Sequence, residues 1–232
     1  MSNEEYDRRK IFLICSMALF TIAVSIALGT AVSLDLKDMF LDPIDIKTSA
    51  TMLGEIMGIL FLGFAITLFI ASPFMDTIGM GRALAMAAIL VIAGNIVLVF
   101  AESIASGSDI YWVLWAGMLL KGMAWGFVES AINPATASLY PDDKTHRLNV
   151  LHAWWPAGLI VGGLSGVAIY ELGLNWQVAL CVVFIPAIAF GLLNIGVKFP
   201  KTESSELDVS FGDMIGEIFK RPSFLYGLAL CS

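Results

Sequence analysis

Six apolar runs, each long enough to cross a lipid bilayer as a helix, follow one another between residues 11 and 197. A membrane-spanning helix needs about 20 apolar residues, and a spanning segment must satisfy its backbone polar groups internally. The runs therefore predict an all-α membrane protein with six transmembrane helices. Their predicted bounds are 11–34, 49–74, 82–100, 111–140, 149–172 and 176–197.

The composition supports an integral membrane protein. Hydrophobic residues make up 58% of the chain and charged residues 14%, with a mean hydropathy of +0.84, whereas soluble domains are about half apolar and a quarter charged. The net charge of −7 lies in the connecting segments, and no basic run beyond residues 8–10 suggests nucleic acid binding. The three cysteines have no metal-binding spacing, so no metal or cofactor is expected.

Lysine and arginine predict the orientation, because cytoplasmic segments of membrane proteins are enriched in both. With the N-terminus in the cytoplasm, two basic residues fall on the outside, Lys37 and Lys47. Ten fall on the inside: Arg8, Arg9, Lys10, Arg82, Lys144, Arg147, Lys198, Lys201, Lys220 and Arg221. We therefore expect a multi-pass protein of the cytoplasmic membrane with both ends of the six-span unit inside.

The predicted organisation has four parts. Residues 1–10 form a cytoplasmic N-terminus, residues 11–197 a six-span bundle, and residues 198–221 a polar cytoplasmic loop. The apolar run 222–232 has about half the length of a span, so we interpret it as the start of a seventh span in a chain that is cut there. Among the connections, 34–47 and 141–148 are expected as loops and 76–82 as a tight turn.

The fourth span carries two charges, although one charge at the bilayer centre costs about 3 kcal/mol. Lys121, Trp125, Glu129 and Asn133 recur every four residues and stay within one broad helix face. This set suits a polyhydroxylated solute, and the carboxyl suits a proton as well. Two other interpretations remain open. Lys121 and Glu129 could form a structural ion pair, or Lys121 could extend toward the interface.

Other polar and aromatic residues have alternative interpretations. His152 could join a cavity, gate its inner end beside Trp154 and Trp155, or lie in the interfacial aromatic belt; the gate and the belt are favoured. Trp125 could line the cavity or only pack. Glu55 could face water or meet a polar group on a further part of the protein.

Glycines at four-residue spacing predict close helix contacts. Gly122 and Gly126 lie beside the polar face of span four, so a neighbouring helix could approach there. In span five, Gly158, Gly162 and Gly166 form a row that predicts a helix-packing seam.

Residues 72–84, SPFMDTIGMGRAL, resemble the signature loop of the major facilitator superfamily. Asp76, Gly79 and Arg82 fall on its pattern, whereas Ser72 stands where glycine is usual and Gly81 where a basic residue is usual. The segments ESAINP, LYP and LHAWWPAG, from Glu129 onward, look like the fucose:proton symporter branch and its sugar-porter relatives.

The resemblance implies the N-terminal half of a twelve-span transporter, built from two inverted three-helix repeats. It implies a solute site at the midplane between this bundle and a C-terminal six-span half, with alternating access. The branch's span-four carboxylate for sugar and proton maps onto Glu129, and Lys121 is near a frequent span-four arginine. The branch also uses an acid within span one, which is absent here, since Asp35 lies at its outer end. The glycine–proline signature of drug antiporters is missing from span five, which favours symport or uniport.

An intramembrane protease and a channel-like or structural protein are the two rival functions. Residues 163–166, GLSG, echo rhomboid-type intramembrane proteases, which need a histidine close to Ser165. His152 lies about 20 Å away along the same helix, so an enzyme is not expected. A channel-like or structural six-helix protein is the alternative to a carrier. We predict a secondary active transporter for a small polar solute, a sugar by resemblance, coupled to protons.

Overall fold

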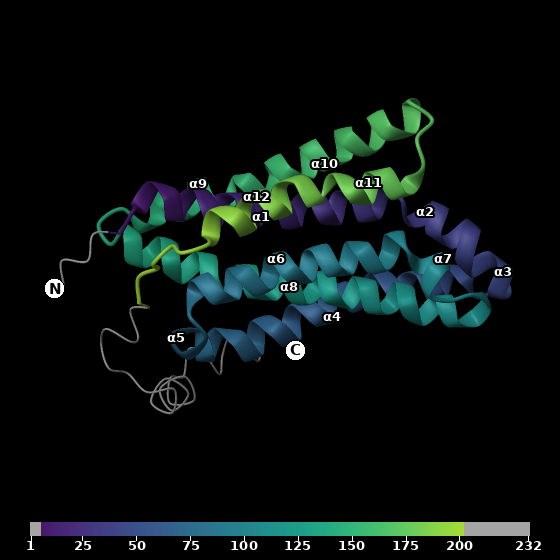
Figure 1. Ribbon diagram of the computed structural model, residues 1–232, viewed down its shortest axis with the longest axis horizontal. Coiled ribbons are helices and arrows are strands. Elements are labelled where there is room, and N and C mark those ends of the chain that lie inside the picture. The colour runs from purple at the N-terminus through teal and green to yellow at the C-terminus, as the bar shows by residue number, and fades with distance from the viewer. Residues whose placement is uncertain (1–5, 202–232) are drawn as a thin grey trace, which may run out of the picture.

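The computed structural model describes residues 6–201, and every regular element in that range is a helix (Figure 1). Residues 1–5 and 202–232 lie outside the described part. Most of the predicted loop 198–221 and the whole predicted start of a seventh span, 222–232, therefore stay predictions.

Each of the six predicted spans corresponds to one helix or to two consecutive helices. Spans one to four are α1 (Arg8–Ala31), α4 (Ser49–Ala71), α6 (Met80–Val99) and α8 (Ile110–Leu139). Span five is α9 (Lys144–His152) with α10 (Trp154–Glu171), and span six is α11 (Trp176–Val182) with α12 (Phe184–Asn194). The shorter elements are α2 (Ser33–Leu36), a π-helix (Lys37–Leu41), α3 (Asp42–Asp45), α5 (Met75–Ile78), α7 (Ala101–Ile104) and two 3₁₀ turns (Ser72–Phe74, Gly107–Asp109).

Prolines explain why spans five and six are interrupted. A proline inside a helix has no N–H to donate, and its ring clashes with the carbonyl four residues earlier. Pro156 lies four residues after His152, where α9 ends, and Pro186 lies four residues after Val182, where α11 ends. Each span nevertheless continues past its break, as the membrane-spanning stretches Lys144–Glu171 and Trp176–Asn194, so the predicted fifth and sixth spans are confirmed. In α8 the helix continues through Pro134.

The segment 34–47, predicted as a loop, is helical as α2, the π-helix and α3. Leu36, Phe40 and Leu41 recur at helical spacing and are buried, so one apolar face holds this segment against the bundle. Pro43 lies in the first turn of α3, where a helix tolerates proline. The predicted loop 141–148 was also too long, because α9 already begins at Lys144.

Five stretches of the described residues are long and apolar enough to cross a membrane: Arg8–Ala31, Ser49–Ile78, Met80–Val99, Lys144–Glu171 and Trp176–Asn194. The 30-residue α8, which carries Lys121 and Glu129, is not among them. It instead contacts α1, α4 and α6. The polar helix α8 thus packs against three more apolar helices, α1, α4 and α6.

The helix contacts follow the pattern of two inverted three-helix repeats. α8 packs on α4 and α6, and α1 packs on α10 and α12. These two groups of helices can be followed in Figure 1. Contacts between α1 and α8 and between α6 and α12 join the groups. Exchanging spans one to three with spans four to six maps the α8 contacts with α4 and α6 onto the α1 contacts with α10 and α12, and it leaves the α1–α8 and α6–α12 contacts unchanged. Since each repeat has three spans, the second starts on the opposite side of the membrane.

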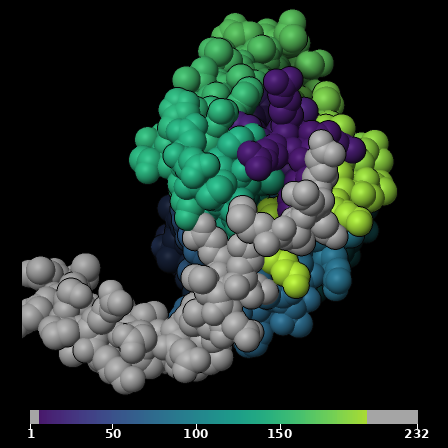
Figure 2. Space-filling view, turned by 90° about the vertical axis from the view of Figure 1, so that its left-hand side faces the viewer, coloured from purple at the N-terminus to yellow at the C-terminus, as the bar shows by residue number. Residues whose placement is uncertain are grey.

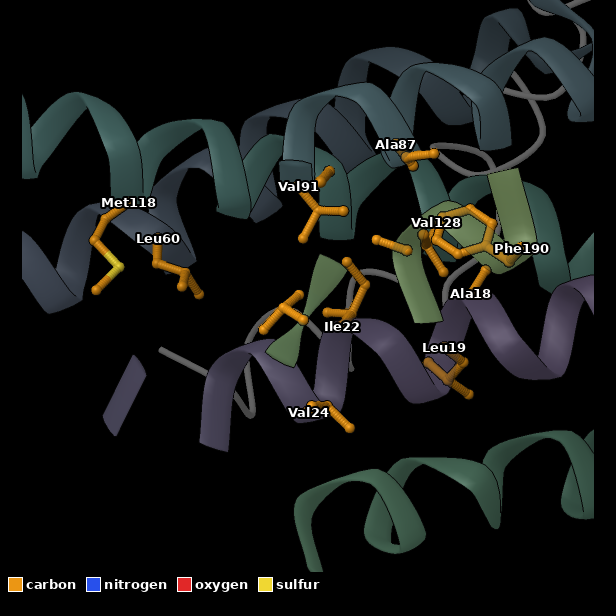
Figure 3. Close-up of a cluster of buried hydrophobic side chains, with 14 of the residues drawn as sticks. Ala18, Leu19, Ile22, Val24, Leu60, Ala87, Val91, Met118, Val128 and Phe190 are labelled. Carbon is orange, nitrogen blue, oxygen red and sulfur yellow. The ribbon is translucent and has the colours of Figure 1, made fainter. Parts of the chain in front are cut away.

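The core lies where the two groups meet (Figure 3). Ile22 of α1, Val91 of α6, Val128 of α8 and Phe190 of α12 are at most 2% exposed. Lipid is as apolar as these side chains, so their stabilising effect comes from close packing rather than from escape from water.

Glycines bring α10 onto α1. A Cβ on Gly158 would lie 2.7 Å from the Cβ of Ala23, and one on Gly162 would lie 2.8 Å from the Cβ of Ala27. Gly166 makes the equivalent approach to Ala31. The predicted seam is confirmed, and it fixes α10 against α1.

Glycines also bring α4 onto α8. A Cβ on Gly126 would lie 2.6 Å from the Cβ of Thr67, and one on Gly122 would overlap the backbone carbonyl of Leu60. The close approach predicted beside the polar face of α8 is therefore confirmed.

Most of the basic residues predicted to be cytoplasmic lie on elements at one end of the bundle. Figure 1 places the start of α1, the α5–α6 turn, α9 and the end of α12 at that end, and α2, α3 and α7 at the other. Figure 2 looks onto the first end. There the start of α1 (purple) lies between α9 (green) and the segment after α12 (yellow). Lys37 and Lys47 belong to the opposite end.

Candidate functional site

Glu129 is held by two donors of its own helix. Nε1 of Trp125 donates to Oε1 across 3.3 Å, and Nδ2 of Asn133 donates to Oε2 across 3.1 Å. The same amide nitrogen lies 3.2 Å from the backbone oxygen of Glu129. The spacing of four residues places one donor a turn before the carboxylate and one a turn after it. All three side chains are half-buried, so the carboxylate is reachable from outside the bundle.

His152 extends this group from span five. Its Nε2 lies 2.9 Å from Oδ1 of Asn133. His152 is the last residue of α9, just before the break that Pro156 imposes, and it is exposed. The break therefore brings a ring nitrogen of span five to the polar face of α8.

An aromatic stack borders the carboxylate. Trp125 stacks on Phe64 of α4, with centroids 4.0 Å apart, and on Trp155 of α10, with centroids 5.0 Å apart; both interplanar angles are 22°. Phe61 meets Trp125 edge-on at 5.9 Å. We call Trp125, Glu129, Asn133, His152 and Trp155 the Glu129 cluster; it joins α8 to α9 and α10, and its stack reaches α4.

Lys121 lies apart from the Glu129 cluster. It is 3% exposed, and its Nζ donates to the backbone oxygen of Ser25 on α1 across 3.2 Å. In residues 6–201 no ion pair joins Lys121 to Glu129. Two predicted alternatives, the structural ion pair and extension to the interface, are therefore wrong. Each four-residue step turns 40°, so two steps rotate Lys121 toward α1.

Of the adjacent tryptophans in span five, the structure brings Trp155 to the cluster. Trp154, the predicted gate residue, is 42% exposed and meets Phe20 of α1 edge-on at 6.1 Å. Neighbouring residues on a helix point about 100° apart, so only one of the two rings can face α8. The sequence indicated that Trp154 and Trp155 are important together, but the rotation of α10 determines which of the two faces α8.

The turn between α4 and α6 has a conformation that requires glycine. Gly79 has φ 85° and separates α5 from α6, a region that side chains with a Cβ rarely adopt. Asp76 and Arg82 flank it and line a cavity of about 590 Å³ together with Asn194 and Lys201. The three predicted residues of this turn thus lie around one hollow at this end of the bundle.

Gly81, which departs from the signature pattern, is covered by the segment after span six. A Cβ on Gly81 would lie 3.0 Å from the ring of Phe199. Nδ2 of Asn194, at the end of α12, donates to the backbone oxygen of Gly81 across 2.7 Å. A long basic side chain in place of this glycine would meet Phe199.

The family model of the Major Facilitator Superfamily matches residues 12–232. The chain belongs to the major facilitator superfamily. Members of this family are membrane transporters that move small solutes across a lipid bilayer. No curated protein matches the chain of this facilitator.

This facilitator has a further polar contact between spans, near the other end of the bundle. The hydroxyl of Tyr111 on α8 donates to Oε2 of Glu55 on α4 across 2.6 Å. Glu55 was expected to face water or to meet a polar group on a further part of the protein, and neither alternative included Tyr111. Across residues 6–201, no group of three His, Cys, Asp or Glu side chains could hold a metal ion.

Proposed function

We propose that this facilitator moves a small polar solute, a sugar, across the cytoplasmic membrane by alternating access coupled to protons. The observation that carries the proposal is the Glu129 cluster, a half-buried carboxylate between two neutral donors and beside an aromatic stack. In this proposal the N-terminus lies in the cytoplasm, and a second six-span half supplies the facing wall.

The donors of Glu129 suit a hydroxyl-rich solute. Trp125 and Asn133 are uncharged, so a sugar hydroxyl can replace either hydrogen bond without separating an ion pair. The indole rings of Trp125 and Trp155 supply the apolar surface that solute sites combine with a few polar groups. Carboxylate, amide and indole would thus each bind a different part of one small ring.

The same carboxylate suits proton coupling. In the described part of the chain, Glu129 has no cationic partner within salt-bridge distance. Proton uptake therefore changes its charge without breaking a salt bridge. Lys121, buried against Ser25, is proposed to tie α8 to α1 rather than to bind the solute.

Conformational control is proposed for the inner end. Asp76, Gly79 and Arg82 form the turn beside the cavity there. The same role is proposed for His152 and Trp154, which lie at the junction of α9 and α10 in span five. Charged residues at a helix end can stabilise one of two access states. Asp76→Ala should then lower the transport rate more than solute binding. Unchanged values for both would leave the turn without this role.

Glu129→Gln tests the proposal, because it keeps the side-chain shape and removes the titrating group. The transporter is reconstituted in vesicles and assayed with tritiated L-fucose, D-galactose and D-glucose. The wild type should accumulate one of them under an inward proton gradient, whereas the variant should exchange it across the membrane without accumulating it. Full gradient-driven uptake by the variant would refute the coupling role, and ohmic currents without counterflow would identify a channel.

A further inference from the structure

The polar contacts of Asn133 fix which way its side-chain amide faces. The atoms of Glu129 near Asn133 are the carboxylate Oε2, at 3.1 Å, and the backbone oxygen, at 3.2 Å. Both are acceptors when the carboxyl is ionised. The nitrogen of the amide must therefore face Glu129, because the opposite orientation would oppose oxygen to oxygen. The amide oxygen then faces His152.

This orientation determines which nitrogen of His152 carries a proton. The amide oxygen of Asn133 has only lone pairs to offer, and Nε2 of His152 lies 2.9 Å from it. A neutral imidazole has one N–H, so its proton must be on Nε2 for this contact to be a hydrogen bond. A bare Nε2 would place two acceptors 2.9 Å apart.

We infer that His152 is a positioning residue of the Glu129 cluster: it donates from Nε2 to Asn133 and so fixes the amide that holds Glu129. The donor comes from α9 and the acceptor from α8. Without it, the amide of Asn133 would be free to turn and withdraw its N–H from the carboxylate. The role of His152 in solute binding rests on the proposed function, whereas the hydrogen-bond direction does not.

The hydrogen-bond direction is testable without any solute. The 232-residue chain has two histidines, so His146→Gln leaves the imidazole of His152 as the only one. Nitrogen-15 NMR of this variant at about pH 8.5, about two units above the ordinary histidine pKa, reports the neutral tautomer. We expect the Nε2–H form, shifting to a mixture in Asn133→Leu but not in the matched variant Asn149→Leu on α9. An Nδ1–H form before any change at Asn133 would overturn the inference.

The transport consequence has its own comparison. His152→Leu removes the donor, and His152→Gln offers an amide N–H of similar reach. For the sugar that the wild type transports, we expect half-maximal uptake to need about tenfold more solute in His152→Leu and no more than about threefold more in His152→Gln. The same leucine change at exposed His146 is the control and should have no effect. Equal values for the leucine and glutamine variants would remove the positioning role. If the wild type transports no sugar, the proposed function fails, while the tautomer still decides the hydrogen-bond direction.

Discussion

The rings of Trp125 and Trp155 stack with centroids 5.0 Å apart, so an aromatic contact between α8 and α10 borders Glu129. The stack also restrains the indole whose Nε1 donates to the carboxylate. Trp155 therefore acts on the Glu129 carboxylate through the ring of Trp125.

Trp155→Leu should weaken solute binding by about two- to tenfold, since an aromatic pair contributes about 0.5–1.5 kcal/mol beyond its buried area. The measurement is the concentration for half-maximal sugar uptake. Trp112→Leu is the matched control, because Trp112 is 62% exposed and contacts Tyr111 and Trp115 rather than the Glu129 cluster. An equal loss in both variants would contradict a specific role for the stack.

Gly158→Ala should destabilise the bundle by about 1–3 kcal/mol, the usual cost of overpacking. The added Cβ would lie 2.7 Å from both Ala23 Cβ and the Phe20 carbonyl oxygen. The same change at Gly163, which has no neighbour within 4 Å of such a Cβ, should leave stability unchanged or slightly raised. Thermal unfolding in detergent compares the two, and similar midpoints would argue against the α1–α10 seam.

Lys121→Met should not restore transport to Glu129→Gln. The two residues are not paired, and their positions are about 12 Å apart along α8. Effects at such distances usually add to within about 0.5 kcal/mol. Uptake measured for both single variants and the double variant gives the coupling, and recovery in the double variant would reveal an ion pair after all.

Lys37 should stabilise the α2–α3 connection up to alkaline pH. Hydrogen bonds to Asp42 and then Asp38 raise the pKa of Lys37 above its ordinary value. A raised pKa means that the stabilisation is fully present below about pH 10.4 and is lost as the pH rises through the folded-state value. Lys37→Met should lower the unfolding midpoint at pH 7, and this difference should shrink at strongly alkaline pH. Lys47→Met, with an exposed side chain, should change little at either pH.

The sequence predicted the features that depend on one helix at a time. Apolar length located the six spans, and four-residue spacing located both glycine contacts. The breaks before Pro156 and Pro186 also have a sequence signal, the proline itself, whose ring clashes with the carbonyl four residues earlier.

Features that depend on helix rotation were not predictable in the same way. Each step of four residues turns the helix by 40°, so Lys121 and Glu129 lie within one broad face of α8. Two such steps are enough for Lys121 to contact Ser25 of α1 while Glu129 contacts Trp125. The choice of Trp155 over Trp154 has the same origin. Such outcomes depend on the position of α1 and α10 around α8, which no local pattern encodes.

The approach of Lys121 to α1 limits how two distant positions can change during evolution. A Cβ on Gly29 would lie 3.1 Å from Nζ of Lys121, so a larger residue there requires the ammonium to shift by a few tenths of an ångström beside the carbonyl of Ser25. Homologues without a lysine at position 121 can accept a larger residue at position 29. Homologues with a larger residue at position 29 should more often lack the lysine at position 121. Positions 29 and 121 should therefore covary among homologues, and this pair would mark the α1–α8 contact in relatives of unknown structure.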